Sequence, residues 1–127
     1  MNPIKDIKDL QETMFRHHPE CRYDGGPRFL PKDLSLSRIV MMQEELDEYK
    51  DAVKEKDMEE TLDALIDLMV FVCGTIYLHG FTEIFPEAWR RVQTANLQKF
   101  AGNKNRGTDC DMIKPWDWKP PTFKDLL

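Results

Sequence analysis

The feature that most constrains the fold of this chain is a nearly continuous apolar run from Ala64 to Leu78. Asp67 is the only side chain in the run expected to be charged at neutral pH, since Cys73 and Tyr77 ionise only weakly there. The run is shorter than the roughly 20 residues that a membrane span needs, and it contains a charge. Because a helix that is apolar on nearly every side is buried on nearly every side, the run predicts a central helix that also faces a partner subunit.

Apolar residues recur at helical spacing in three further segments of the chain. We expect these helices at Pro3 to about His17, at Ser35 or Ser37 to about Lys56, and at about Pro86 to Phe100. The central helix is expected to begin near Asp57 and to end at His79-Gly80, with Gly80 just after its C-cap. The sequence shows no strand-like alternation, so it predicts an all-α fold with a bundle of four to five helices.

Prolines and glycines mark the irregular parts of the chain. A loop is expected from Glu20 to Asp33, and a tail over residues 101–127. Trp89 is expected in the core, whereas Trp116 and Trp118 are expected to anchor the tail. Residues 1–127 are interpreted as one domain with its core at about 34–100, since single domains commonly have this length.

The composition indicates in which cellular compartment the protein is expected and which class of partner is excluded. Three cysteines at wide spacing predict no disulfide framework, and the N-terminus carries no apolar signal segment. We therefore expect a soluble cytoplasmic protein that does not associate with a membrane. A net charge of −5 argues against a dedicated nucleic-acid binder, because such domains usually carry positive charge.

The charges are unevenly distributed along the chain. The segment from Glu44 to Asp67 contains eleven acids and three bases, whereas the segment from Ala88 to Thr108 contains five bases and no acid. A bound triphosphate requires both a metal ion and Lys or Arg side chains. The acidic segment is therefore the candidate metal site, and the basic segment is the candidate phosphate-binding side.

The acids form two lines at helical spacing. The first line is Glu44, Glu45 and Glu48, and the second is Glu60, Asp63 and Asp67. A short turn near residues 56–58 would bring two antiparallel helices, and with them the two lines, face to face. Facing carboxylates repel one another unless a cation neutralises them. Oxygen ligands favour Mg²⁺, and the absence of His and Cys from both lines disfavours zinc.

Each line also has an interpretation without chemistry. The first line fits an ordinary solvated helix face. Glu60 and Asp63 fit acids that complement a helix dipole. Asp67 would need a partner such as Arg38 or Arg90, because an isolated buried carboxylate is costly.

The segments Glu44 to Glu48 (EELDE) and Glu60 to Leu68 (ETLDALIDL) resemble the ExxE…ExxD pattern of the all-α nucleoside triphosphate pyrophosphohydrolases. This MazG-like superfamily includes phosphoribosyl-ATP pyrophosphohydrolase and the dimeric-dUTPase-like enzymes. With Asn96-x-x-Lys99 and the tail from Lys114 to Pro121, the chain is most similar to the single-domain branch found in bacteria and phages. The similarity covers about residues 34–121.

The resemblance implies an all-α fold, dependence on Mg²⁺ with Mn²⁺ as an alternative ion, and a homodimer or dimer of dimers. It also implies cleavage of a nucleotide between the α and β phosphates to give a monophosphate and pyrophosphate. Glu44 or Glu45 is the expected general base for a metal-activated water. The expected metal ligands are Glu45, Glu48, Glu60, Asp63 and Asp67; the expected substrate-binding residues are Asn96, Lys99, Arg91 and Lys104.

Two alternatives and several details stay open at this level. The second acidic motif fits either Glu60 with Asp63 or Asp63 with Asp67, and Asp63 belongs to both. A non-catalytic helical module that assembles into oligomers would carry the same apolar helix. A phosphoribosyl-ATP pyrophosphohydrolase would share the chemistry but not the substrate, and the extended tail and long first loop rank it lower. The preferred base and sugar are not determined by the sequence.

Overall fold

The computed structural model describes residues 1–19 and 22–127, which form two compact units, Met1–Thr82 and Glu83–Leu127. The prediction of an all-α fold is confirmed, since the described part of the chain contains four α-helices and a small two-stranded hairpin. Of the expected loop, Glu20 and Cys21 lie outside the described residues. The interpretation of the chain as one domain stays a prediction.

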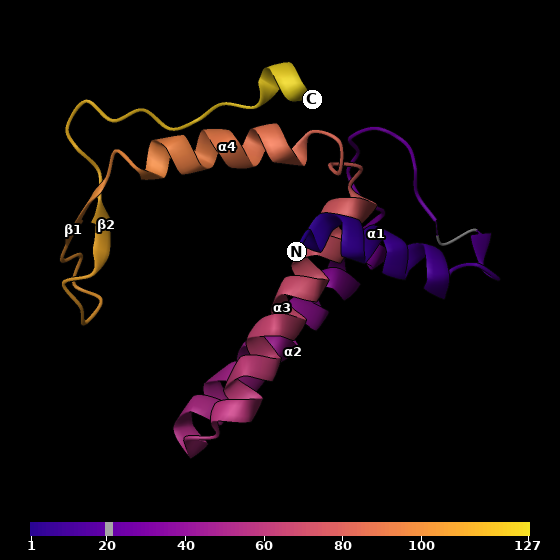
Figure 1. Ribbon diagram of the computed structural model, residues 1–127, viewed down its shortest axis with the longest axis horizontal. Coiled ribbons are helices and arrows are strands. Elements are labelled where there is room, and N and C mark those ends of the chain that lie inside the picture. Colours follow the sequence, from indigo (N-terminus) through magenta and orange to yellow (C-terminus); the bar gives the residue numbers. More distant parts are fainter. Residues whose placement is uncertain (20–21) are drawn as a thin grey trace. The chain divides into compact units, whose positions relative to one another are not determined.

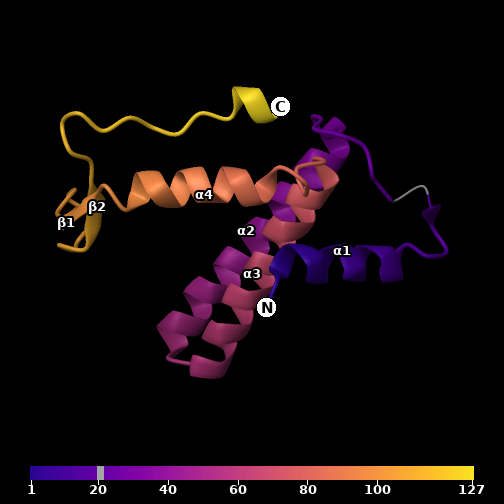
Figure 2. The same cartoon turned by 45° about the horizontal axis from the view of Figure 1, so that its top comes forward.

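The first unit contains α1 (Pro3–Met14), α2 (Lys32–Glu55) and α3 (Met58–Leu78). Helices α2 and α3 lie side by side as an antiparallel hairpin, and α1 packs across α3 (Figures 1 and 2). The predicted short turn is confirmed. Lys56 adopts a left-handed conformation (φ 57°) at the end of α2, and the Asp57 carboxylate caps α3 by accepting from the Glu60 amide at 3.1 Å.

The irregular segment after residue 22 covers the carboxyl end of α3. Arg28 donates from its side chain to the Leu78 carbonyl at 2.9 Å and from its amide to the His79 carbonyl at 2.9 Å. Leu30 packs there with Tyr77 and Leu78 in a buried cluster. Gly80 has a φ of +73°, as its predicted position after the C-cap requires.

Three helix boundaries differ from the predictions. Helix α1 ends at Met14 rather than His17, and α4 ends at Asn96 rather than Phe100 because Phe100 enters a strand. Helix α2 begins at Lys32, before the expected Ser35 or Ser37. Pro31 stands at its N-cap with no side-chain capping bond, so the serines that look like caps lie inside the first turns.

Helix α3 is less buried in this chain than its composition suggests. Its buried residues include Ala64, Cys73 and Gly74, but large apolar side chains are exposed on it: Leu62, Leu65, Ile66, Met69 and Val72. By length and composition alone, α3 is also the one described helix that could cross a membrane. It packs against both α1 and α2, as a core helix does.

The second unit contains α4 (Phe85–Asn96), β1 (Phe100–Gly102), β2 (Asp111–Ile113) and the 3-10 turn η2 (Lys124–Leu126). The strands pair antiparallel, with Phe100 opposite Ile113 and Gly102 opposite Asp111. The expectation of no strands is therefore wrong at this hairpin. Strands of three residues are too short to show a period of two in the sequence.

The tail after β2 runs back along α4 (Figures 1 and 2). Trp118 anchors it as predicted, because its indole N–H donates to the Ala95 carbonyl at 2.8 Å. Trp116 is 97% exposed, so the expectation that it anchors the tail is wrong for the described residues. The placement of Trp89 in the core is wrong, since 61% of this residue is exposed.

Candidate metal centre and phosphate-binding residues

The α2–α3 hairpin brings the two acidic lines together around Glu45. One carboxylate oxygen of Glu45, Oε2, is buried and has no hydrogen-bond partner. Burial, a hydrogen bond to Glu48, and repulsion from Glu48, Asp67 and Asp63 raise the pKa of Glu45 to about 7. Like charges and desolvation together disfavour the ionised form, which is how perturbed carboxyls at functional sites arise.

Glu60 extends the same group of carboxylates towards the turn. Repulsion from Asp63 is the main cause that raises the pKa of Glu60, followed by burial and by Asp57 and Glu48. Asp63 and Glu48 therefore act on both Glu45 and Glu60. We call the five predicted metal ligands the carboxylate cluster: Glu45, Glu48, Glu60, Asp63 and Asp67.

Glu44, the other candidate base, is exposed on α2. Its carboxylate is not among the groups that raise the pKa of Glu45 or Glu60. Asp63 acts on both of those groups. Which residues form the second acidic motif stays a prediction.

Arg38 does not provide the ion pair that would have explained Asp67 structurally. This buried guanidinium donates to the Thr75 hydroxyl at 3.0 Å and to the Phe71 carbonyl at 2.8 Å. A Cβ at Gly74 would lie 2.6 Å from Arg38 Nη2, so the glycine makes room for the arginine. Sequence reasoning missed this role, although a glycine inside an apolar helix was the available signal.

The donor chemistry of the carboxylate cluster fits a hard divalent cation. All five side chains offer oxygen, and a cation would relieve their mutual repulsion and satisfy the buried Oε2 of Glu45. Within residues 1–19 and 22–127, no group of three or more His, Cys, Asp or Glu side chains is already arranged to hold a metal ion. The roles of these residues as metal ligands stay predictions.

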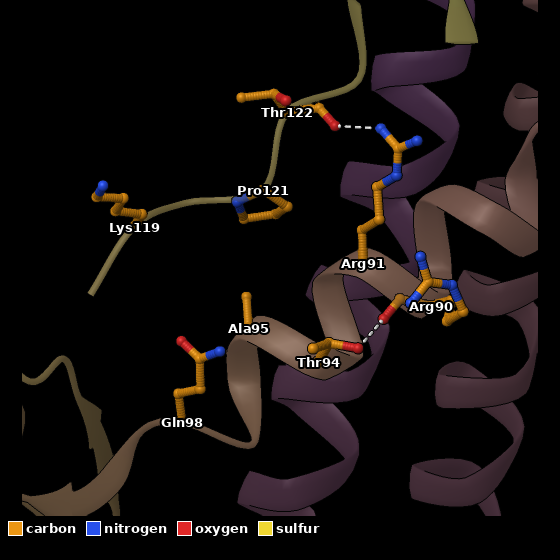
Figure 3. Close-up of a pocket in the computed structure, with 8 residues that line it drawn as sticks. All are labelled: Arg90, Arg91, Thr94, Ala95, Gln98, Lys119, Pro121 and Thr122. Atoms are coloured by element: carbon orange, nitrogen blue, oxygen red, sulfur yellow. Dashed lines mark hydrogen bonds between the residues drawn. The ribbon is translucent and has the colours of Figure 1, made fainter. Parts of the chain in front are cut away.

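Arg91 of α4, a predicted substrate-binding residue, is engaged both by the tail and by Glu87 of its own helix. Its guanidinium donates to both carboxylate oxygens of Asp125 at 2.7 and 2.6 Å, to Glu87 at 2.9 Å and to the Thr122 carbonyl at 2.8 Å. Figure 3 shows this last bond beside a cavity of about 360 Å³ between α4 and the tail. Arg90 pairs with Glu87 as well.

The other predicted substrate-binding residues lie near the hairpin of the second unit. Lys99 donates from Nζ to the Asn96 side-chain oxygen at 3.1 Å, so the two residues of the Asn-x-x-Lys motif contact each other directly. Lys104 is exposed in the connection between the strands, where its backbone amide donates to Asp111 at 3.2 Å. Their binding roles stay predictions.

A family model described as phosphoribosyl-ATP pyrophosphohydrolase matches residues 8–96. The matched segment includes both acidic lines and ends at Asn96. A comparison with curated proteins found no significant match.

Proposed function

The chain belongs to the phosphoribosyl-ATP pyrophosphohydrolase family, within the MazG-like all-α superfamily, and from this we propose that it is a Mg²⁺-dependent nucleoside triphosphate pyrophosphohydrolase. It would cleave a ribo- or deoxynucleoside triphosphate between the α and β phosphates to a monophosphate and pyrophosphate. The observation that carries the proposal is the carboxylate cluster, in which one glutamate titrates near neutral pH beside three other acids.

In this proposal Glu45, Glu48, Glu60, Asp63 and Asp67 would hold Mg²⁺, or Mn²⁺ in its place. When bound, the ion would lower the pKa of a coordinated water and neutralise charge that develops on the phosphates. The pKa of Glu45, about 7 without a bound ion, reflects how strongly burial and the neighbouring acids act on this side chain. A bound cation would lower this pKa, because it favours the ionised carboxylate. Glu45 would either ligate the ion or, left unligated, act as the general base. Glu44 is a weaker candidate base, because it is not among the groups that act on Glu45 or Glu60.

The phosphates and sugar would be bound by side chains of the second unit. Asn96 and Lys99 support this role because their side chains are already in contact. Arg91 would have to give up contacts with Asp125 or Glu87 to bind a phosphate, so it is a weaker candidate. Lys104 is exposed and its side chain is free of ion pairs within the described residues.

The protein would act as a cytoplasmic homodimer or dimer of dimers, without nucleic-acid or membrane partners. The exposed apolar side chains of α3 support assembly, because a monomer rarely leaves a long apolar helix face in water. This surface would be covered by a second copy of the chain.

The test is release of pyrophosphate from a panel of ribo- and deoxynucleoside triphosphates and phosphoribosyl-ATP in the presence of Mg²⁺. We expect Asp63→Asn to abolish release while its helical circular dichroism is retained. Glu55→Gln is the matched control, since it neutralises an exposed acid at the end of α2 outside the cluster. Normal turnover by Asp63→Asn would contradict the proposed metal site.

Two other functions are distinguished from this proposal, one by the same panel of substrates and one by thermal melting. The description of the matched family model favours phosphoribosyl-ATP as substrate, which would show as selective turnover of that compound. The exposed face of α3 suits an oligomer interface whether or not chemistry occurs, so it is also compatible with a non-catalytic module that only assembles. A ligand that binds only the folded state raises its melting temperature, so no shift with Mg²⁺ and nucleotide would support the module.

A further inference from the structure

Two lysines lie close to the ring of one tryptophan in the second unit. The Nζ of Lys99 lies 4.7 Å from the centroid of the Trp118 ring, and the Nζ of Lys114 lies 4.9 Å from it. Lys99 precedes β1 and Lys114 follows β2, so pairing of the strands brings both residues to the tail. An ammonium group at this distance is attracted by the ring.

The ring that orients these lysines is itself held in place. Trp118 is half-buried, and its indole N–H donates to the carbonyl of Ala95 in α4 at 2.8 Å. Lys99 is held a second time, because its Nζ also donates to Asn96 at 3.1 Å. The two ammonium groups are therefore positioned by the fold rather than free to sample the full range of a surface lysine.

The arginines of the same unit differ from these lysines in having acidic partners. Arg90 and Arg91 pair with Glu87, Arg91 also pairs with Asp125, and Arg106 pairs with Asp111. Neither Lys99 nor Lys114 makes an ion pair with any residue that the structure describes. Their positive charge is therefore available to an anion from outside the chain.

We propose that Lys99 and Lys114, oriented by Trp118, form a binding site for the phosphoryl groups of a polyphosphate. Lys114 is then a further substrate-binding residue, and Trp118 is a positioning residue. The identity of the bound polyphosphate as the triphosphate of a nucleotide rests on the function proposed above. Two ammonium groups held at one ring suit a ligand that carries more than one negative phosphoryl group, and binding would break no internal ion pair.

The direct test is calorimetric titration of the full chain with inorganic pyrophosphate in buffer free of divalent cations. We expect Lys114→Gln to weaken binding by about tenfold or more, the usual scale for one hydrogen bond to a charged group. Lys114→Arg should restore most of the affinity. Lys124→Gln is the matched control, because it removes a lysine charge from the same tail away from the ring.

The role of Trp118 is tested by a pair of substitutions. Trp118→Phe keeps an aromatic ring but loses the bond to Ala95, whereas Trp118→Leu loses both. If the ring positions the lysines, the Phe variant binds pyrophosphate more tightly than the Leu variant. Equal affinities would show that Trp118 only anchors the tail, and would overturn its positioning role.

The outcomes separate this site from the proposed function. A chain that hydrolyses no nucleotide but loses pyrophosphate affinity in Lys114→Gln keeps the site and overturns the function. A chain that hydrolyses nucleotides while Lys114→Gln leaves both KM and pyrophosphate affinity unchanged keeps the function and overturns the site. Wild-type protein that binds no pyrophosphate would also overturn the site.

Discussion

Glu45 has a proposed role in the carboxylate cluster, but its ionised form costs stability when no metal ion is bound. Without a bound ion its pKa is raised to about 7, which means that the ionised form needed for the proposed role destabilises the fold. A carboxyl whose pKa is raised on folding holds its proton more tightly in the folded state. The stability that this proton contributes is therefore present below the ordinary pKa of a glutamate, about 4.3. It is lost as the pH rises from there to the raised pKa of the folded chain, about 7.

We predict that Glu45→Gln lowers pyrophosphate release by about 100- to 10,000-fold, the usual contribution of a general base. The same variant should melt at a higher temperature than wild type above pH 7 in metal-free buffer, because it removes a charge from the carboxylate cluster. Thermal melting followed by circular dichroism measures this. Glu55→Gln should change neither quantity, and a lower melting temperature for Glu45→Gln would show that the cluster is not repulsive.

At the residue scale, the sequence anticipated the members of the carboxylate cluster better than their surroundings. Helical spacing alone placed Glu45 and Glu48 on one acidic line and Asp63 on the other, because the geometry of a helix is local. It could not show that Arg38 is occupied by α3 backbone and side-chain oxygens. That fact depends on which turn of α2 meets which turn of α3.

The turn between α2 and α3 sets how the two acidic lines face each other. Lys56 occupies a left-handed conformation there that glycine adopts without strain. We predict that Lys56→Gly stabilises the chain by up to about 1 kcal/mol, measured by urea unfolding. The matched control is Lys54→Gly, which lies inside the last turn of α2 and should destabilise by about 0.5–1 kcal/mol. A loss of stability for Lys56→Gly would contradict this account of the turn.

The ion pairs of Arg90 and Arg91 with Glu87, and of Arg91 with Asp125, help to hold the tail on α4. We predict that they break in acid and release the tail. Hydrogen bonds from Arg90 and Arg91 lower the pKa of Glu87 to about 2, and a hydrogen bond from Arg91 lowers the pKa of Asp125 to about 2. Both pKa values lie below the ordinary carboxyl values of about 4. The ion pairs therefore contribute their full stability above about pH 4, and this contribution is lost as the pH falls towards 2.

Tryptophan fluorescence measures this release, since Trp118 sits on α4 only while the tail is docked. The wild-type signal should change between about pH 4 and pH 2. Asp125→Asn removes one of the two carboxylates, so its signal at pH 7 should already have moved towards that of the acid form. An identical acid transition in the variant would show that Asp125 does not hold the tail.

At the scale of the whole molecule, a single chain leaves several large apolar side chains exposed to water. Leu62, Leu65 and Met69 of α3 are each more than 40% exposed, and Trp89 of α4 is 61% exposed. Such side chains are usually covered by a partner. The apolar run therefore predicted burial that a single chain does not provide, which agrees with the proposed assembly.

We predict that the wild-type chain sediments as a dimer or larger species, and that Leu65→Glu shifts it towards monomer. A buried charge without a partner is costly at an interface. Lys8→Glu, an equally drastic change on the exposed surface of α1, should leave the sedimentation unchanged. A wild-type chain that stays monomeric at every concentration would contradict the assembly.

The sequence by itself determined the helices, the short turn between α2 and α3, and the two acidic lines, because each depends on residues within a few positions of one another. Only the tertiary structure decided the hairpin of Phe100–Gly102 with Asp111–Ile113 and the placing of Lys99 and Lys114 on Trp118. Three-residue strands and contacts across long separations leave no periodic trace in a sequence. They form because pairing and packing satisfy backbone and side-chain groups that are distant along the chain.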